Sequence, residues 1–270
     1  MADSSAAFVG SIPELYDRHL GPLLFEPYAR DLAARLAPAA TPRRVLELAC
    51  GTGLLTRRLR ERLAPDVALV ATDLNEGMLE VARARLGPLP ALTFQQADAQ
   101  SLPFADAEHG AVVCQFGWMF FPDKPRAARE ALRVLARGGQ LLFNVWDSLA
   151  ENPLGRVVHE TLARLFPADP PDFYRVPFGF HDPDAIRAQL RDAGFERIEV
   201  EGVAHTARAP AAEHAAIGLV RGNPVVAAIQ QRGGDPEHVV RAVASALRAQ
   251  LGAGPLEAPM RALAIAARRP

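Results

Sequence analysis

The chain has few of the residues that mark a disulfide-stabilised or metal-binding protein. Only two of its 270 residues are cysteines, Cys50 and Cys114. Both lie in apolar stretches typical of central strands, where a thiol packs as a small hydrophobe, so we expect no disulfide. The seven histidines are scattered, and no Cys-x-x-Cys or His-x-x-x-His spacing occurs. The sequence therefore predicts no metal site.

An excess of charge of one sign and long apolar runs are also missing. The chain has 30 Lys and Arg residues against 31 Asp and Glu residues, and Lys124 is its only lysine. A net charge of -1 argues against a nucleic-acid partner. No apolar stretch is long enough to span a bilayer, and no basic cluster precedes an apolar run at the N-terminus, so we expect a cytoplasmic protein with no membrane span. Whether it forms a homodimer is left open.

What the sequence does contain is an apolar pattern typical of an α/β protein. Hydrophobic residues make up 49% of the chain, which is enough for one sizeable core. Short apolar runs predict strands near residues 44–49, 67–73, 91–96, 110–116, 139–146, 195–203 and 260–267. Between them, helices are predicted near 54–64, 77–86, 125–137, 154–166, 183–193 and, with a break at 233–234, 211–251. Gly138 and Gly139 are expected to cap the helix at 125–137.

The region before residue 42 is predicted to be helical and amphipathic, with Pro38 and Pro42 ending it. We interpret residues 1–42 as a helical lid and 43–147 as a ligand-binding core. Residues 148–270 are interpreted as the remainder of the core with helical insertions over the site, in one compact domain. Asp182 is expected to cap a helix that Gly194 ends.

The most informative segment is 45–55, Val-Leu-Glu-Leu-Ala-Cys-Gly-Thr-Gly-Leu-Leu, followed by an apolar run that ends in Asp73. It predicts a strand, a glycine loop, a helix and a second strand ending in a carboxylate, as in nucleoside-binding units. A P-loop would need Gly-Lys-Ser/Thr, but leucines follow Gly53. A dinucleotide fingerprint would need a third glycine at Thr56, which weakens that interpretation. Asp73 lies about 20 residues after Gly53, as expected for a ribose-binding acid. A nucleoside without a pyrophosphate fits these facts.

Residues 47–53, Glu-Leu-Ala-Cys-Gly-Thr-Gly, resemble the first motif of the class I S-adenosylmethionine (SAM) dependent methyltransferases. Residues 73–79 resemble the ribose-binding strand end of that family, and residues 97–104 resemble its adenine-contacting loop. Over roughly residues 40–147 the pattern is most similar to small-molecule methyltransferases of the ubiquinone/menaquinone-biosynthesis type. The resemblance implies a doubly wound, Rossmann-like, mostly parallel seven-stranded sheet with an antiparallel last strand. It also implies SAM as cofactor and S-adenosylhomocysteine as product.

The resemblance places the amino-acid tail of SAM at the glycine loop. Gly51 and Gly53 let the backbone approach the tail. The main-chain carbonyl near Ala49 is expected to accept from the ammonium, with Glu47 supplying negative charge nearby. An ion pair between Glu47 and a neighbouring arginine stays open as the alternative.

The nucleoside is expected to bind at the two following loops. Asp73 presents two acceptors to the ribose diol, although capping the next helix is an alternative role for it. Asp98 and the amide of Ala99 are expected to bind the adenine edge. Leu74 and Met78 are expected to pack on the adenine faces, with ordinary core packing left open for Met78.

Residues 112–121 are expected to lie beside the reactive methyl group. They lack the Asp/Asn-Pro-Pro-Tyr/Phe motif and the Pro-Cys nucleophile of base methyltransferases, which again argues against a nucleic-acid acceptor. Gln115 is expected near the cofactor. Phe25, Trp118, Phe120 and His181 are the predicted acceptor-pocket residues, and core packing is the alternative for the two aromatic residues at 118 and 120.

Tyr16 is the predicted lid contact over SAM. His19 is the candidate general base, because imidazole has the unperturbed pKa nearest neutral pH. A surface histidine on an amphipathic helix is the alternative. Residues 221–224, Arg-Gly-Asn-Pro, are expected either to end a helix or to bind an acidic group of the acceptor.

The predicted reaction is transfer of the SAM methyl group to an O, N or C atom of a small, apolar metabolite by in-line displacement. Two alternatives stay open. One is a SAM-binding protein with a non-methylating or regulatory role, and the other is a nicotinamide-dependent oxidoreductase.

Overall fold

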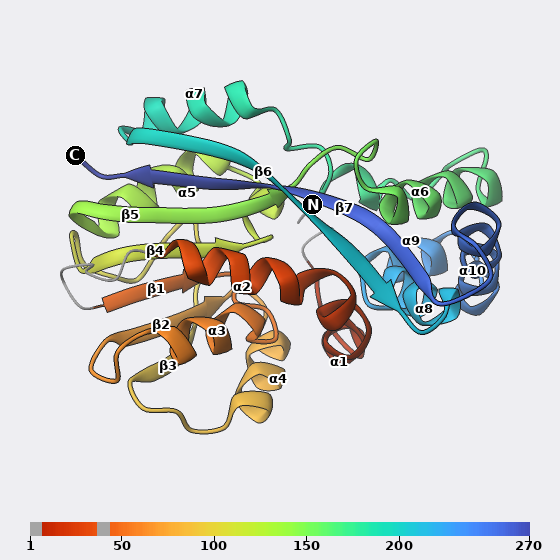
Figure 1. The fold of residues 1–270 in the computed structure, drawn as a ribbon, viewed down its shortest axis with the longest axis horizontal. Helices are drawn as coiled ribbons and strands as arrows, with labels where there is room; N and C mark the ends of the chain where they lie inside the picture. Colours follow the sequence, from red (N-terminus) through yellow and green to blue (C-terminus); the bar gives the residue numbers. More distant parts are fainter. Residues whose placement is uncertain (1–6, 37–43) are drawn as a thin grey trace.

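The computed structural model describes residues 7–36 and 44–270, so the predicted helix end at Pro38 and Pro42 lies outside the described residues. Its core is a seven-stranded sheet in the order β3-β2-β1-β4-β5-β7-β6 (Figure 1). Strands β1 to β5 are parallel, and β7 runs antiparallel between β5 and β6. The predicted fold class and the antiparallel last strand are confirmed. The strands are β1 Arg44–Leu48, β2 Ala68–Asp73, β3 Leu92–Gln96, β4 His109–Gln115, β5 Leu135–Trp146, β6 Glu196–Ala209 and β7 Leu256–Arg268.

Helices precede, connect and follow these strands. The N-terminal ones are α1 Ile12–Leu15, the π-helix η2 Tyr16–Phe25 and α2 Glu26–Arg35. The core contains α3 Leu54–Arg62, α4 Glu76–Leu86, the short η3 Trp118–Phe120, α5 Lys124–Val134 and α7 Pro183–Ala193. The remaining ones are α6 Pro153–Leu165, the short η4 Phe173–Arg175, α8 Ala212–Arg221, α9 Val225–Gln231 and α10 Pro236–Leu251.

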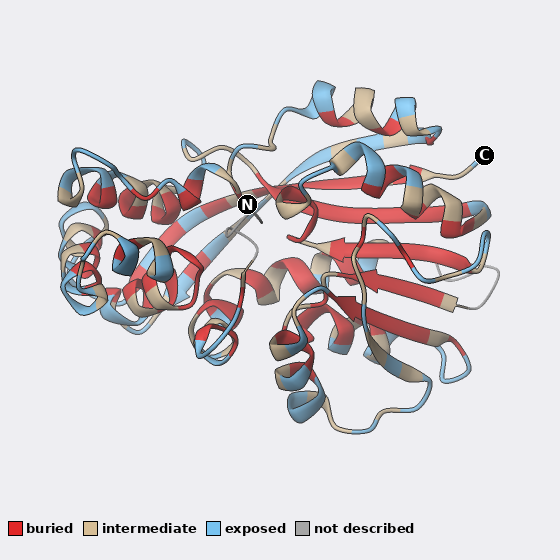
Figure 2. Ribbon diagram, turned by 180° about the vertical axis from the view of Figure 1, so that it is seen from behind, coloured by how far each residue is buried: buried red, intermediate tan, exposed pale blue. Residues whose placement is uncertain are grey.

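Helices cover both faces of the sheet. On one face Val45 of β1 packs in a cluster with Leu59 of α3, and on the other Leu46 of β1 packs in a cluster with Ala131 of α5. Figure 2 shows the parallel strands β1, β2, β4 and β5 buried along most of their length, whereas the edge strand β3 is only partly covered. This double burial explains why the strands appear in the sequence as continuous apolar runs.

Strands β6 and β7 extend beyond the rest of the sheet as a two-stranded ribbon. β5 ends at Trp146, opposite Ala262, whereas β6 and β7 stay paired as far as Ala209 opposite Leu256. Helices α8, α9 and α10 lie between these two strands in the sequence, and α6 packs against α10 (Figure 1). We call α6, η4, α8, α9 and α10 the helical lobe.

The π-helix η2 contacts both the glycine loop and the helical lobe. Asp17 accepts a hydrogen bond from the Thr52 hydroxyl at 2.8 Å and forms an ion pair with Arg85 of α4. On the lobe side, a Cβ at Gly218 of α8 would lie only 2.8 Å from the Cβ of His19. Gly218 therefore allows the close approach of α8 to η2.

One predicted boundary is wrong. Helix α5 ends at Val134, and Gly138 and Gly139 lie inside β5 instead of capping the helix. The register of β4 against β5 shifts between His109 and Ala111, and Gly138 has a φ of +73° at this irregularity. The chain enters the sheet before the glycines because Leu135 already pairs with His109. The glycines thus allow the backbone to form a bulge in the strand. By contrast, the Asp182 cap and the end of α7 at Gly194 are confirmed.

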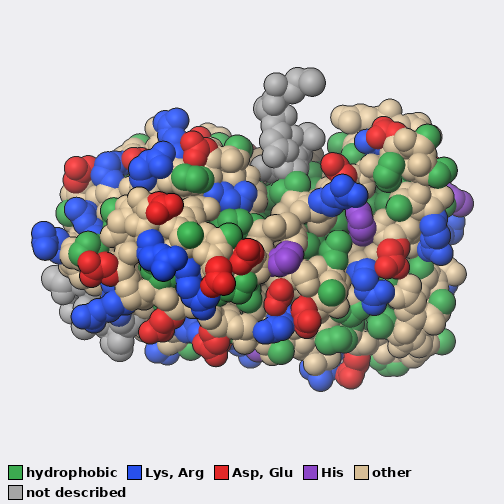
Figure 3. Space-filling model, turned by 90° about the horizontal axis from the view of Figure 1, so that it is seen from above, with side chains coloured by type: hydrophobic (Ala, Val, Ile, Leu, Met, Phe, Trp, Pro, Cys, Tyr) green, Lys and Arg blue, Asp and Glu red, His purple; other side chains and the backbone are tan. Residues whose placement is uncertain are grey.

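On the face drawn in Figure 3, basic and acidic side chains are interspersed. None of the described helices is long and apolar enough to cross a membrane. In residues 7–36 and 44–270, no group of three His, Cys, Asp or Glu side chains is arranged to hold a metal ion.

Candidate active site

A cavity of about 350 Å³ lies at the carboxyl ends of β1, β2 and β4 and extends to the helical lobe. Its volume is in the range of small-molecule sites. Strands β1 and β4 are neighbours at the point where the strand order reverses, which is where open α/β sheets bind ligands. The cavity is therefore the candidate active site.

The glycine loop forms one edge of this cavity. Ala49 and Gly51 line it with φ angles of +50° and +56°. A non-glycine residue at positive φ is strained, and such residues cluster at functional sites. Gly53 does not line the cavity; its φ is +81°, and a Cβ there would lie 2.9 Å from Leu86 Cδ1. Gly53 thus allows α3 to begin against α4, and only Ala49 and Gly51 face the ligand space.

Asp73 connects the ends of β1 and β2. Its side chain is 6% exposed, Oδ2 accepts from the backbone N–H of Gly51 at 2.9 Å, and Oδ1 accepts from the backbone N–H of Asn75 at 2.8 Å. Burial raises the pKa of Asp73, and these backbone donors oppose the rise. The helix α4 has Asn75 at its N-cap, so Asp73 is not the cap itself. Oδ1 also accepts from the Asn75 Nδ2 at 3.4 Å, a long contact that a closer donor from the cavity can replace, and Oδ2 keeps a free lone pair.

Glu47 lies beneath the loop and not on the cavity wall. It alternates with Leu46 and Leu48, so its side chain points to the sheet face that carries α3. It is 1% exposed, and neither carboxylate oxygen has a well-formed hydrogen bond or an ion pair with a described residue. Burial raises the pKa of Glu47 to about 8, and the nearby Thr56 opposes that rise only in part. The alternative of an arginine partner is therefore not seen in the described chain.

The predicted adenine-binding residues come together. Leu74, Met78, Asp98 and Ala99 all line the cavity. Leu74 is 54% exposed, while Met78 also belongs to a buried cluster with Phe8 and Ile12. Both roles considered for Met78, core packing and cavity wall, are thus present.

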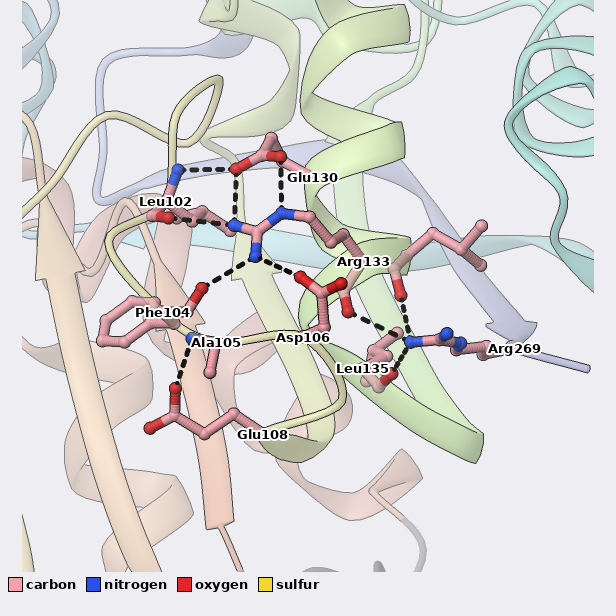
Figure 4. Close-up of polar contacts among 10 residues, drawn as sticks. Leu102, Phe104, Ala105, Asp106, Glu108, Glu130, Arg133, Leu135 and Arg269 are labelled. Carbon is pink, nitrogen blue, oxygen red and sulfur yellow. Dashed lines mark hydrogen bonds and ion pairs between the residues drawn. The ribbon is translucent and has the colours of Figure 1, made fainter.

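A network centred on Arg133 of α5 holds the loop that carries Asp98 (Figure 4). The Arg133 guanidinium donates to the carbonyl oxygens of Leu102 and Phe104 at 2.9 and 2.8 Å and pairs with Glu130 at 2.8 Å. Glu130 in turn accepts from the Leu102 N–H at 2.8 Å. No local pattern marks this arginine in the sequence, because the carbonyl groups that it binds lie about 30 residues away in the chain.

The end of β4 forms the floor between the two halves of the cavity. Gln115 lines it and donates through Nε2 to the Phe25 carbonyl at 3.2 Å, while its Oε1 has no partner among the described residues. Phe116 follows with a φ of +52°. A Cβ at Gly117 would lie 2.3 Å from the Cβ of Ala49, so only glycine allows β4 to turn away beside the glycine loop.

The remaining wall is apolar and mostly aromatic. Trp146 stacks on Phe116 with ring centroids 4.1 Å apart and an interplanar angle of 16°. The predicted residues Phe25 and Phe120 are also on this wall. The aromatic-rich stretch 166–180 was a usable signal for three lining residues that the sequence did not single out, Phe173, Tyr174 and Phe178. Further lining residues were not expected from the sequence: Trp146, Leu154, Leu219 and Met260.

Tyr16 of η2 closes the cavity from the N-terminal side. Its ring stacks on Phe25 at 4.8 Å and meets Phe8 edge-on at 5.8 Å. Burial, with the Asp73 carboxylate second, raises the pKa of Tyr16 well above its usual range. The phenol is therefore neutral near pH 7.

Besides Glu47 and Gly53, three more predicted site residues do not line the cavity. Trp118 is fully buried and stacks on Phe143 at 4.4 Å, so it is core because the η3 turn directs it inward. His19 faces His214 of α8 at 5.9 Å because η2 packs its other side over the site. His181 precedes α7 and is partly exposed outside the cavity. These placements contradict the acceptor-pocket predictions for Trp118 and His181 and move His19 away from the candidate base position.

Comparisons with known proteins agree with this geometry. A methyltransferase domain family matches residues 45–139. The ubiquinone/menaquinone biosynthesis C-methyltransferase of Ectopseudomonas mendocina is 38% identical over 169 residues, covering 57% of this chain and 66% of that protein. The demethylmenaquinone methyltransferase of Deinococcus radiodurans is 33% identical over 177 residues, covering 62% of this chain and 73% of that protein.

The fold has solved counterparts as well. A candidate methyltransferase from Bacillus halodurans superimposes with a TM-score of 0.58 at 22% identity and covers 91% of this chain and 98% of that one. At this identity the likeness concerns the fold, while the sequence relatives establish the family. The chain belongs to the class I SAM-dependent methyltransferase family, in which it resembles the ubiquinone and menaquinone biosynthesis enzymes.

Proposed function

We propose that the protein transfers the methyl group of SAM to a small, uncharged, ring-bearing acceptor held between the strand ends and the helical lobe. One observation carries this proposal. Among the described residues that line the cavity, the only charged side chains are Asp73 and Asp98, and both belong to the cofactor side. A charged acceptor would be buried on the lobe side without a partner, which is costly. An apolar acceptor with flat faces would match the aromatic wall.

We propose that SAM binds at the strand-end side of the cavity. We propose that Asp73 binds the ribose diol, that Asp98 and the Ala99 amide bind the adenine edge, and that Leu74 and Met78 contact the adenine faces. We propose that Gln115, which lines the cavity and whose buried Oε1 has no partner among the described residues, lies beside the tail or the sulfonium. Ala49 and Gly117 both line the cavity, and they approach so closely that a Cβ at Gly117 would lie 2.3 Å from the Cβ of Ala49. Bound SAM supplies an electrophilic methyl group on a sulfonium.

The role of the protein is then mainly to position the acceptor and to keep the site dry. Orientation of two bound reactants can supply much of a rate enhancement. No histidine lies among the described cavity-lining residues, and Tyr16 stays protonated near pH 7. Neither group proposed as catalytic from the sequence is thus placed to accept a proton. We propose that the acceptor is itself electron-rich and that Tyr16 acts as a lid over the two ligands.

Label transfer from methyl-labelled SAM tests the proposed function. The panel consists of quinols, phenols, amines and polyketide-like compounds, each with a charged analogue. We expect transfer to uncharged ring compounds and little to the analogues. The Tyr16→Phe variant should fold normally and show altered turnover or SAM retention, and a change confined to thermal stability would return Tyr16 to a structural role.

Calorimetric titration with SAM, S-adenosylhomocysteine and NAD separates the alternatives. SAM binding without label transfer to any panel member would favour a non-methylating role. NAD binding without SAM binding would contradict the proposal.

A further inference from the structure

The segment 221–224, Arg-Gly-Asn-Pro, connects α8 to α9 and divides its side chains between the surface and the cavity. Arg221 pairs with Glu237 of α10, away from the site. Gly222 packs against η2, where an added Cβ would lie 3.3 Å from the backbone nitrogen of Tyr16. Asn223 is 9% exposed and lines the cavity. The arginine therefore does not bind the acceptor, and the asparagine is the polar group that this segment presents to it.

The orientation of the Asn223 amide is determined by its neighbours. Its Nδ2 donates to the carbonyl oxygen of Leu219 at 3.1 Å, and only the nitrogen end of an amide can donate to a carbonyl. The Tyr174 hydroxyl donates to the same carbonyl at 2.6 Å. The Asn223 side chain also forms a hydrogen bond with the Tyr174 side chain. Because the single hydroxyl hydrogen of Tyr174 is donated to Leu219, Nδ2 is the donor in this second contact, and Oδ1 is left without a protein donor.

The Asn223 Oδ1 accepts no hydrogen bond from a described residue. The atom is not fully buried, and Asn223 lines the cavity, so Oδ1 is accessible to a ligand. The other asparagine of the lobe wall, Asn152, differs. Its Nδ2 donates to the carbonyl oxygens of Ser148 and Arg261 at 3.0 Å each, and its Oδ1 accepts from the Arg261 N–H at 3.0 Å. The Asn152 side chain therefore links the backbone of Ser148 to that of Arg261, and its polar atoms are used within the protein. Asn223, by contrast, offers a free acceptor in an otherwise apolar wall.

We propose that Asn223 determines acceptor specificity by accepting a hydrogen bond from a neutral hydroxyl or N–H group on an otherwise apolar acceptor. This inference rests on the proposed function. A site built around a buried acceptor atom disfavours analogues that lack the matching donor, because that atom is then left unpaired. The group bound by Asn223 is a recognition group on the lobe side of the cavity.

Matched probes test this proposal by calorimetry in the presence of saturating S-adenosylhomocysteine. 2-Naphthol carries a hydroxyl donor, and 2-methoxynaphthalene replaces it with a methyl ether. We expect the wild-type protein to bind 2-naphthol about 5- to 50-fold more tightly than 2-methoxynaphthalene. This range follows from the free energy of one buried hydrogen bond and the cost of burying its acceptor without a donor. Equal affinity of the wild type for the two probes overturns the proposal.

The variant Asn223→Leu should remove this preference while S-adenosylhomocysteine binds as in the wild type. The carbonyl of Leu219 keeps the Tyr174 hydroxyl as its donor, so the loss of Nδ2 leaves no orphaned carbonyl. Arg221→Ala is the matched control in the same segment and should keep the preference. Asn223→Ala serves if the leucine does not fold.

The two proposals fail in different ways. An unchanged 2-naphthol preference in both Asn223 variants overturns the role of Asn223, even if label transfer to other acceptors succeeds. Absence of label transfer across the whole panel, with the Asn223-dependent preference intact, counts against the methyl-transfer proposal and leaves the recognition role standing.

Discussion

Replacement of Asp73 by asparagine separates the two tasks that the structure gives this carboxylate. Asp73 accepts backbone hydrogen bonds from Gly51 and Asn75 through its two oxygens. In the proposed complex each oxygen also accepts a ribose hydroxyl. An asparagine keeps only one acceptor, and its NH₂ group must face either the Gly51 or the Asn75 N–H. The substitution therefore removes the charge and sets two donors against each other.

The expected loss follows from these contacts. A hydrogen bond to a charged group contributes about 1.5 to 3 kcal/mol, and the two ribose bonds overlap in part. SAM binding should therefore weaken by about 2 to 4 kcal/mol, which is roughly 30- to 700-fold in Kd. The misplaced NH₂ should also lower the stability of the free protein by about 1 to 3 kcal/mol.

Calorimetric titration with SAM at a temperature where both proteins are folded gives the affinity, and thermal melts give the stability. Glu76→Gln is the control, because Glu76 is a neighbouring exposed carboxylate that pairs with Arg83 and does not line the cavity. Its SAM affinity should match that of the wild type. Unchanged SAM affinity in Asp73→Asn would refute the ribose role and leave Asp73 as an anchor of the glycine loop only.

Three further predictions concern stability and the shape of the site. Arg133→Ala should lower stability by about 2 to 3 kcal/mol and weaken SAM binding, because the loop around Leu102 loses the hydrogen bonds that hold it. Thermal melts measure the stability and calorimetric titration measures the affinity. An unchanged melting temperature would contradict the role of the network. Gly117→Ala should be strongly destabilising or inactive, since its Cβ would meet that of Ala49 at 2.3 Å, and a folded, active variant would disprove this constraint. Burial lowers the pKa of His109 from 6.5 to about 4. As the pH falls below 6.5, His109 therefore binds a proton in the unfolded chain but not in the folded protein, and the free energy of unfolding decreases. Relative to His109→Phe, the wild type should lose about 2 kcal/mol between pH 7.5 and 5 in denaturant titrations, and parallel pH profiles would refute the assignment.

The cofactor side of the site was predictable because its residues are close in sequence to the strand ends that place them. Asp73 ends β2, and β2 is parallel to β1, so the carboxylate and the glycine loop meet at one sheet edge. The prediction for Glu47 was less complete. Residue alternation in β1 indicates its direction, but the sheet face that α3 covers is settled only in the fold.

The acceptor side was predicted less well because side-chain direction there depends on packing. Trp118 and Phe120 are two residues apart in one turn, yet the first stacks in the core and the second lines the cavity. His19 was a reasonable base by chemistry, but η2 presents it to α8. Trp146 and Asn223 reach the site from opposite ends of the long β5–α9 region, and no local pattern marks them as neighbours.

The sequence by itself determined the methyl donor, the sheet type and most of the residues that line the cavity at the strand ends. These follow from short motifs at the ends of adjacent parallel strands, where backbone geometry alone brings the residues together. Only the tertiary structure decided the acceptor wall, the free Asn223 oxygen and the absence of a histidine from the described lining. Those features depend on how η2, the β6–β7 ribbon and the helical lobe pack against one another, and such packing is set by contacts between residues far apart in the chain.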